Sequence, residues 1–430
     1  MFYYNVGFRW DIFKSEVPDG VIVHASGSDY EKLHRKDLPS NYPEHRLLDP
    51  DTLLWNLNFE DAPSTCKRIS TYPWVSVDVP GYDSKEGSRR IWLSTKVEAA
   101  ASQNWPPAVP ATEEDISRMV SSCVAVQREF GAEPIIIPTP YIENNATAGM
   151  FVQWLDVAVQ CSSESQLPVL LQVAISDRYL GEAPFDKSAV VEVLDQLTTR
   201  EGNWGIYLLV PNDTDSDRMT NPIAVMNLLE TVYQMAVRYG KLVIVNYVDL
   251  LGAVCLAFGA TGFGGGYEKK GRRLNLDDYE DRGGGGAFPR FLSRTTLRDY
   301  FPRELERLRD LSLLQRLSDQ DKTRASDPLI QRLLAGGPVS EVLEWVERRN
   351  NVAAAQQHFL QAMKQLDHDI SSLTCSSDKV RFVFDWLMTA EERNCSFNNR
   401  CQQEPLVDSS SHVAIWRDAV VEVARRHGLF

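Results

Sequence analysis

The stretch FGATGFGGGY, residues 258–267, follows a continuous apolar run that begins at Leu250, and another apolar run occupies 242–247. Glycines at this density favour a short strand that opens into a loop where another backbone or a ligand approaches closely. Earlier in the chain, short apolar runs alternate with segments of helical length, which is typical of βα units and a parallel sheet. We therefore interpret residues 261–266 as the seventh strand of a (β/α)8 barrel.

Other runs have the composition of strands that are covered on both faces, as in a parallel sheet. They lie at 21–25, 74–79, 134–138, 169–176, 205–211 and 242–247. Segments of helical length lie at 112–130, 147–161, 187–198 and 221–239, and the first of them begins with Thr112 and acidic residues and is followed by Gly131, as capped helices are. A closed barrel needs an eighth strand, for which 287–292 is the best remaining candidate. The predicted fold class is α/β, a TIM-like (β/α)8 barrel.

The pattern changes after the barrel. Beyond residue 310 the strand signal ends and apolar residues recur at helical spacing, as in Val413, Trp416 and Val420. We predict a barrel over 1–310 and an α-helical C-terminal module over 311–430. Two long connections, 81–110 and 267–286, leave the strand ends that face the barrel mouth. We interpret the first as a lid or wall of the site. We expect the second, which begins with basic residues, to be mobile when no ligand is bound.

Composition and charge narrow the range of functions. The chain has 430 residues, of which 43% are hydrophobic, so it can bury a sizeable core. Its formal net charge of −14 disfavours non-specific binding to nucleic acid or to an anionic membrane. Neither a leader pattern nor an apolar stretch of membrane-spanning length is evident, so we expect a cytoplasmic protein without a membrane partner. Its seven cysteines lack a CxxC pair, which predicts reduced thiols.

Polar residues at the carboxyl ends of barrel strands are the candidates for catalysis. Asp78 interrupts the run 74–79 and could act as base or nucleophile, or it could form a salt bridge that locks the rim. His24 closes the strand sequence VIVH, residues 21–24, as a candidate general base or metal ligand, and Asp177 follows 169–176 as a third catalytic candidate. Because no second histidine lies at a strand end, we predict neither a metal centre nor a cofactor.

A second set of residues is predicted to bind the substrate. Polar side chains at strand ends would orient it, and the glycine amides with the basic residues that follow would hold an anionic group, as barrels do near strands seven and eight. The alternative for the basic residues is that they only solvate the loop. The set is Gln172, Asn246, Tyr141, Gly262, Gly264, Gly265, Lys269 and Arg272.

Two segments resemble the tRNA-guanine transglycosylase barrel family. One is DPDT, residues 49–52, and the other runs from DLLGA at 249–253 to FGAT at 258–261. The resemblance implies a TIM barrel and base exchange on a nucleoside by a carboxylate nucleophile. The chain differs where that family carries a catalytic aspartate, since Gly262-Phe263-Gly264 stands there, and Cys375, Cys395 and Cys401 do not match its clustered zinc cysteines.

Two functions are therefore open. The first is a barrel-mouth enzyme, a transferase or hydrolase, that acts on a phosphorylated or nucleoside-type substrate by carboxylate chemistry, through glycosyl or base transfer or through hydrolysis. The alternative is a non-catalytic barrel that serves as an interaction or sensor subunit of a multi-protein bacterial system for defence or nucleic-acid modification. In that case a protein partner would bind the C-terminal helices, whose apolar stripe ends at Arg425 and Arg426.

Overall fold

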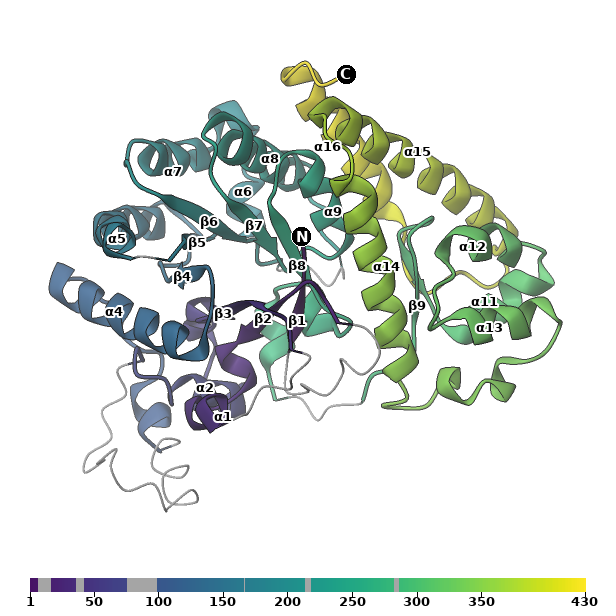
Figure 1. Cartoon of the computed structure of the whole chain (residues 1–430), viewed down its shortest axis with the longest axis horizontal. Helices are drawn as coiled ribbons and strands as arrows, with labels where there is room; N and C mark the ends of the chain where they lie inside the picture. The colour runs from purple at the N-terminus through teal and green to yellow at the C-terminus, as the bar shows by residue number, and fades with distance from the viewer. Residues whose placement is uncertain (7–16, 36–41, 76–98, 166, 213–217, 282–285) are drawn as a thin grey trace.

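The chain forms a nearly closed barrel of parallel strands with a helical C-terminal region (Figure 1). The computed structural model describes residues 1–6, 17–35, 42–75, 99–165, 167–212, 218–281 and 286–430. Eight strands make one sheet in the order β3-β2-β1-β8-β7-β6-β5-β4. Their bounds are β1 Phe2–Val6, β2 Gly20–His24, β3 His45–Asp49, β4 Ile135–Ile137, β5 Val169–Ala174, β6 Trp204–Leu209, β7 Val243–Asn246 and β8 Gly262–Gly265. The predicted TIM-like barrel is confirmed.

The barrel closes at two different joints. At the first, β1 pairs in parallel with β8, with Phe2 opposite Phe263 and Tyr4 opposite Gly265. At the second, between β3 and β4, the backbone link is an isolated bridge in which the Glu133 N–H donates to the Arg46 carbonyl over 2.8 Å. The sheet is therefore continuous from β1 to β8, whereas β3 and the residue before β4 are joined by a single bridge.

Helices cover the outside of the barrel, and several of them begin at a side-chain cap. In α4 (Glu113–Phe130) the Thr112 side chain accepts from the Asp115 N–H, and in α5 (Asn145–Glu164) Asn144 forms a capping box with Thr147. The other helices around the barrel are α1 (Tyr30–Arg35), α2 (Pro63–Ile69), α6 (Asp177–Leu180), α7 (Ala189–Thr198), α8 (Pro222–Tyr233) and α9 (Leu250–Ala257). All residues of α9 are buried because two helices of the C-terminal region, α14 (Ala353–Ser371) and α15 (Ser376–Arg400), cover its outer side.

Two strands differ from the prediction made for the start of the barrel. The strands β1 and β3 were missed and the predicted strand 74–79 takes no place in the described sheet, so the glycine run 261–266 belongs to the eighth strand and not to the seventh. Trp74 and Val75 of the predicted strand 74–79 lie in a turn after α2, and residues 76–79 fall outside the described residues. Tyrosines and Asn5 in β1, and the exposed His45 that begins β3, hide the apolar pattern of a buried strand.

The predicted eighth strand, 287–292, is wrong. Residues of its end form β9 (Phe291–Ser293), which pairs antiparallel with β10 (Arg298–Tyr300) in a separate two-stranded sheet. The turn between them is short, with Leu297 in the left-handed region at φ 54°. This hairpin is a separate sheet and does not contribute to barrel closure.

The C-terminal region is helical and packs directly on the barrel. Its helices are α11 (Pro302–Asp310), α12 (Leu314–Asp321), α13 (Asp327–Leu334), α14 (Ala353–Ser371), α15 (Ser376–Arg400) and α16 (Ser411–Arg426). Helix α16 lies against α8, and the Trp416 indole N–H donates to the Met219 carbonyl over 2.9 Å. The apolar stripe of α16 is thus buried within the chain. Within the described residues, no helix has the length and apolar character needed to cross a bilayer.

A neutral histidine is built into this region. The His358 imidazole is fully buried in α14, where Nε2 donates to the Leu292 carbonyl and Nδ1 accepts from the Thr323 hydroxyl, each over 2.9 Å. Its ring stacks on Phe291 with centroids 4.3 Å apart. Burial lowers the pKa of His358 to about 4. A proton on Nδ1 would turn the Thr323 hydroxyl from donor to acceptor and would place a positive charge in a buried site.

Acidification should therefore weaken the wild type more than an His358→Gln variant. Unfolded histidine gains its proton near pH 6.5 whereas folded His358 does so near pH 4, so its contribution to stability is complete above pH 6.5 and is lost as pH falls. The stability advantage of the wild type over the variant should shrink by about 3 kcal/mol between pH 7 and pH 4. Urea denaturation at several pH values measures it. A constant difference over that interval would contradict the prediction.

Candidate functional site

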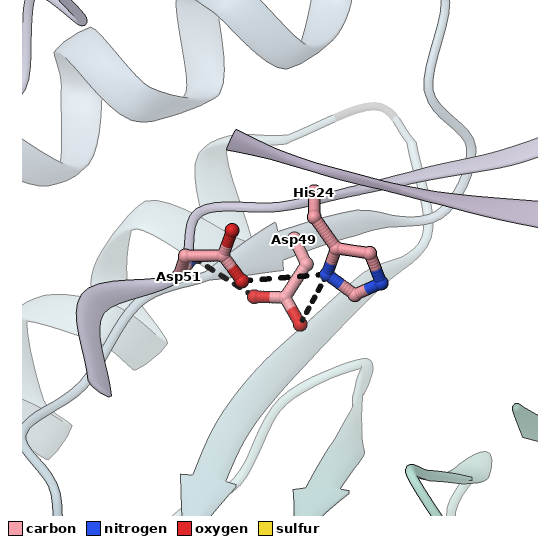
Figure 2. A group of neighbouring side chains, drawn as sticks. All are labelled: His24, Asp49 and Asp51. Atoms are coloured by element: carbon pink, nitrogen blue, oxygen red, sulfur yellow. Dashed lines mark hydrogen bonds and ion pairs between the residues drawn. The ribbon is translucent and has the colours of Figure 1, made fainter. Parts of the chain in front are cut away.

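Three ionisable side chains meet at the carboxyl ends of neighbouring strands β2 and β3 (Figure 2). His24 ends β2 and is the register partner of Asp49, which ends β3, and Asp51 follows two residues later. His24 Nδ1 lies 3.3 Å from Asp51 Oδ1 and 3.7 Å from Asp49 Oδ2. We call His24, Asp49 and Asp51 the carboxylate–histidine cluster. It stands where active sites of barrel enzymes are built.

A chain of hydrogen bonds from the opposite strands holds Asp49. The Tyr207 hydroxyl of β6 donates to Asp49 Oδ2 over 2.7 Å and receives a bond from Asn246 Nδ2 of β7 over 2.6 Å. Asn5 Nδ2 of β1 donates to Asn246 Oδ1 over 2.8 Å. These bonds cross the interior of the barrel, so the position of the Asp49 carboxylate depends on residues from three other strands, β6, β7 and β1. Such a network fixes side chains in advance of any reaction.

Asn5 also determines which nitrogen of His24 exchanges a proton. Asn5 uses its amide group as a donor to Asn246 and to the Gly271 carbonyl, so its Oδ1, 3.2 Å from His24 Nε2, must accept from that nitrogen. The remaining nitrogen, Nδ1, faces Asp51 and lies 2.8 Å from the Tyr247 hydroxyl. Neutral Nδ1 can accept from Tyr247, and protonated Nδ1 can donate to Asp51. Proton exchange is thereby directed to one atom.

Burial and mutual charge change the acidity of the cluster. Asp49 is 1% exposed, and its burial, reinforced by the nearby Asp51 and opposed by His24, raises the pKa of its carboxyl to about 6. Burial alone would lower the pKa of His24, but the carboxylates of Asp51 and Asp49 outweigh it, and the net shift is upward. Groups that titrate near neutral pH are suited to acid–base catalysis.

The backbone at the cluster is held in an unfavourable conformation. Asp51 has φ 53° and Tyr247 has φ 61°, both in the left-handed region that non-glycine residues rarely occupy. In this conformation the Asp51 N–H donates to Asp49 Oδ1 over 2.9 Å, and Asp51 Oδ2 accepts from the Ser26 N–H over 2.7 Å. The turn thus points the other oxygen of Asp51 at His24. Strain of this kind concentrates at functional sites, where surrounding contacts enforce it.

The donor atoms of the cluster also match those that bind divalent cations. A ring nitrogen of His24 and one carboxylate oxygen each from Asp49 and Asp51 lie within 4.8 Å of one another. This is a donor set that Zn²⁺ or Mn²⁺ accepts. The bond from His24 Nε2 to Asn5 Oδ1 is the outer contact expected for a metal-binding histidine. The arrangement is therefore capable of acid–base chemistry or of cation binding.

The predicted catalytic residues fall in different places. His24 is at the centre of the cluster. Asp177 begins the short helix α6 beyond β5 and is buried. Asp78 lies outside the described residues, so its role stays a prediction.

The residues predicted to orient the substrate lie on the mouth side of the barrel. Asn246 belongs to the network behind Asp49, and Gln172 of β5 donates from Nε2 to Thr52 Oγ1 over 3.0 Å, next to Asp51. Tyr141 lines a pocket of about 80 Å³ at the carboxyl ends of β3 and β4, which Thr52 and Trp154 also line. A larger pocket of about 630 Å³, near Leu57 and Trp105, does not include any residue of the cluster.

The predicted anion-binding residues are engaged within the chain. Gly262, Gly264 and Gly265 form β8, whose backbone pairs with β1 and β7 on either side. Arg272 is buried and forms an ion pair with Asp299, and Lys269 Nζ lies 3.6 Å from Asp278. Contact between these groups and a bound anion stays a prediction. To bind Arg272 or Lys269, an incoming anion would have to displace the carboxylate of Asp299 or Asp278.

Several residues of the site were not among the sequence candidates. Asp49 and Asp51 appeared only in the segment 49–52 that carries the family resemblance, because the strand before them was not predicted. Tyr207 and Asn5 lie inside strands, where polar groups that face the barrel interior look like ordinary strand residues. Strand alternation around Asn5, between Tyr4 and Val6, was the available signal.

Gly264 shows why the eighth strand is rich in glycine. A Cβ at this position would overlap Asn246 Oδ1 and would lie 2.8 Å from both Asn246 Cγ and Ile22 Cδ1. The Gly264→Ala variant should therefore push Asn246 away from Tyr207 and Asn5 and cost about 1–3 kcal/mol of folding free energy. Urea denaturation measures the loss. In the control, Gly149→Ala, a helical site with open space, should stabilise by about 0.5–1 kcal/mol. Equal stability of both variants would contradict the prediction.

Comparison with known proteins found no relative of this chain. The fold and the cluster define a TIM-like barrel protein with a buried group of two aspartates and a histidine at its mouth. No protein-family model matches the chain, and neither a curated protein nor a solved structure is significantly similar to it. Function must therefore be argued from the site.

Proposed function

We propose that this protein is an enzyme that works at the barrel mouth on a phosphorylated or nucleoside-type small molecule, by glycosyl or base transfer or by hydrolysis. The observation that carries the proposal is the contact of His24 with Asp49 and Asp51 at the carboxyl ends of β2 and β3. Carboxylates in this position can act as a base or as a nucleophile, and an imidazole can supply the proton.

The geometry supports a division of roles. Asp51 is the reacting carboxylate, since its Oδ1 faces His24 while Oδ2 is held by the Ser26 N–H. His24 holds the proton that is exchanged at Nδ1, and Asn5 keeps the other nitrogen as a fixed donor. Asp49 stabilises the positive charge that develops on the imidazole, as the aspartate of a Ser-His-Asp triad does.

The substrate class is supported by two separate features. The segment that resembles the tRNA-guanine transglycosylase family, 49–52, contains both aspartates of the cluster. The neighbouring pocket has aromatic walls from Tyr141 and Trp154 and polar groups from Thr52 and Asn56, which suits a planar ring with polar substituents.

A second candidate function follows from the donor atoms of the cluster. One nitrogen and two oxygens within 4.8 Å favour hydrolysis assisted by a divalent cation held by His24, Asp49 and Asp51. Such a cation would polarise a substrate oxygen or activate a water molecule. In that case His24 is a ligand and does not transfer the proton.

One experiment tests the proposal and separates the two routes. The purified protein is incubated with a panel of nucleosides, nucleoside monophosphates and sugar phosphates, and chromatography follows released base, released phosphate and exchange of isotope-labelled base. Each reaction found is repeated after EDTA dialysis and after return of Zn²⁺, Mn²⁺ or Mg²⁺. Turnover that survives EDTA supports carboxylate–histidine chemistry, and turnover that returns only with a cation supports the second route. A reaction that is unchanged when Asp51 is replaced by asparagine would refute both.

A further inference from the structure

The carboxylate–histidine cluster is sealed beneath a segment of the chain. His24, Asp49 and Asp51 are respectively 7%, 1% and 4% exposed. Residues 273–281, which include the short helix η5 (Leu276–Tyr279), run from the end of β6, where the Asn212 N–H donates to the Leu274 carbonyl, to α2, where the Ser64 N–H donates to Asp281; we call them the closing segment. The Tyr279 hydroxyl is 3.2 Å from the Tyr247 hydroxyl, which in turn contacts His24. A substrate cannot reach the cluster while this arrangement persists.

The closing segment is built as a unit with its own internal brace. Arg273 Nε donates to Asp278 Oδ2 over 2.9 Å and ties the beginning of the segment to its middle. The Lys270 ammonium lies 5.2 Å from the centre of the Tyr279 ring. The Arg273–Asp278 contact lies within the segment and can persist when the segment moves, whereas the Lys270–Tyr279 contact crosses the segment's beginning and must break.

Hydrogen bonds attach the closing segment to the rest of the barrel, and the side chains of Leu274 and Tyr279 within it are buried against the core. Its first part is held by the Asn212 N–H, which donates to the Leu274 carbonyl over 2.7 Å. Its far end is held by the Ser64 N–H, which donates to Asp281 Oδ2 over 2.6 Å, and by the Asp281 N–H, which donates to the Asp61 carbonyl over 2.7 Å. Thr65 also donates to the Tyr279 carbonyl over 3.3 Å.

A firm anchor precedes the segment. Arg272 is buried, forms an ion pair with Asp299 of β10, and stacks over the Phe359 ring at 4.8 Å. Buried and paired, this side chain is costly to displace. The segment is therefore fixed by a buried ion pair at Arg272 and held by hydrogen bonds at Asp281. A segment anchored firmly at one end and weakly at the other can act as a hinged lid.

We propose that residues 273–281 form a lid that swings away from the barrel mouth about the Arg272 anchor, exposing the cluster for entry and release of substrate. In the closed state Tyr279 covers Tyr247 and His24 and excludes water from the reacting groups. The lid acts on access, so this inference does not depend on which reaction the cluster performs.

Chemical labelling of histidines tests the lid without a substrate. The protein is treated with diethyl pyrocarbonate at constant pH, and peptide mass spectrometry gives the modification rate of each histidine. The exposed His45 and His368 report the activity of the reagent, and the buried His358 and His412 report global unfolding. In the wild type, His24 should react far more slowly than His45.

Two variants each remove one attachment of the closed lid without opening a hole above the cluster. Asp281→Ala removes the carboxylate that accepts from Ser64, and Tyr279→Phe removes the hydroxyl that meets Tyr247. Each should raise the modification rate of His24 about tenfold relative to His45, as expected for the loss of one hydrogen bond. The rates of His358 and His412 should not change. Unchanged labelling of His24 in both variants, or equal acceleration of all buried histidines, would overturn the proposal.

Discussion

An Arg218→Met variant is expected to be about 3–5 kcal/mol less stable than the wild type, because it removes the partner of Asp408. It also leaves Arg272 as the ion-pair partner of the buried Asp249 and Asp299. The Arg218 side chain is 4% exposed, and its Nη1 donates to Asp408 Oδ2 over 2.6 Å. Its Nη2 donates to Asp299 Oδ2 over 3.3 Å, and its Nε lies 3.7 Å from Asp249 Oδ2. Methionine keeps the volume of the side chain and removes only its charge and its donors.

Urea denaturation gives the free energy of unfolding for this variant. A matched control is Arg118→Met, because Arg118 forms ion pairs with Glu114 and Asp115 on the exposed face of α4 and should cost less than about 1 kcal/mol. In a double-mutant cycle, Asp408→Asn should cost less in the Arg218→Met background than in the wild type. Equal costs of Arg218→Met and Arg118→Met would show that the buried pairs contribute nothing beyond surface ones.

Replacing Asp51 by asparagine should lower turnover about 10²–10⁴-fold, the usual contribution of a group that transfers a proton. Asparagine is the appropriate substitute because it tolerates the left-handed backbone that Asp51 adopts at φ 53°. Its amide oxygen can still accept from the Ser26 N–H, so the turn should keep its shape. What is lost is the negative charge that faces His24 Nδ1 at 3.3 Å.

Stability measurements separate a catalytic role of Asp51 from a structural one. Asp49 and Asp51 are buried close together, and their mutual repulsion helps to raise the pKa of Asp49. Removing one of the two charges should therefore leave the folded state as stable as before or more stable, even though activity is lost. Thermal denaturation of the purified variant checks this. A variant that is inactive and also markedly destabilised would indicate that Asp51 serves the fold.

Much of the barrel could be predicted because its later strands are simple. From β4 to β8, apolar runs alternate with capped helices, so composition and spacing agree with the fold. The beginning of the barrel was harder, since β1 carries Asn5 and two tyrosines and β3 begins with the exposed His45. The polar groups that obscured these strands are partly those that build the site.

The candidate site was predicted only in part, for the same reason. His24 was found because β2 was recognised, whereas Asp49 was missed because no strand had been assigned to end there. The environment of Arg272 could not be predicted, since its partner Asp299 lies 27 residues later in a hairpin that had been assigned to the barrel. Contacts of this kind depend on tertiary packing, which local patterns do not report.

The pairing of β1 with β8 has a consequence for how the chain reaches this structure. One edge of β1 can form its backbone hydrogen bonds with β2 early in synthesis, but the other edge pairs with β8, near residue 263. The sheet of β1, β2 and β3 therefore keeps an unpaired edge until β8 has been synthesised. Pairings between such distant segments are slow to form, and unpaired edges invite aggregation. A ribosome-bound fragment that ends before Gly262 should therefore need a chaperone, and release from it should coincide with the emergence of β8.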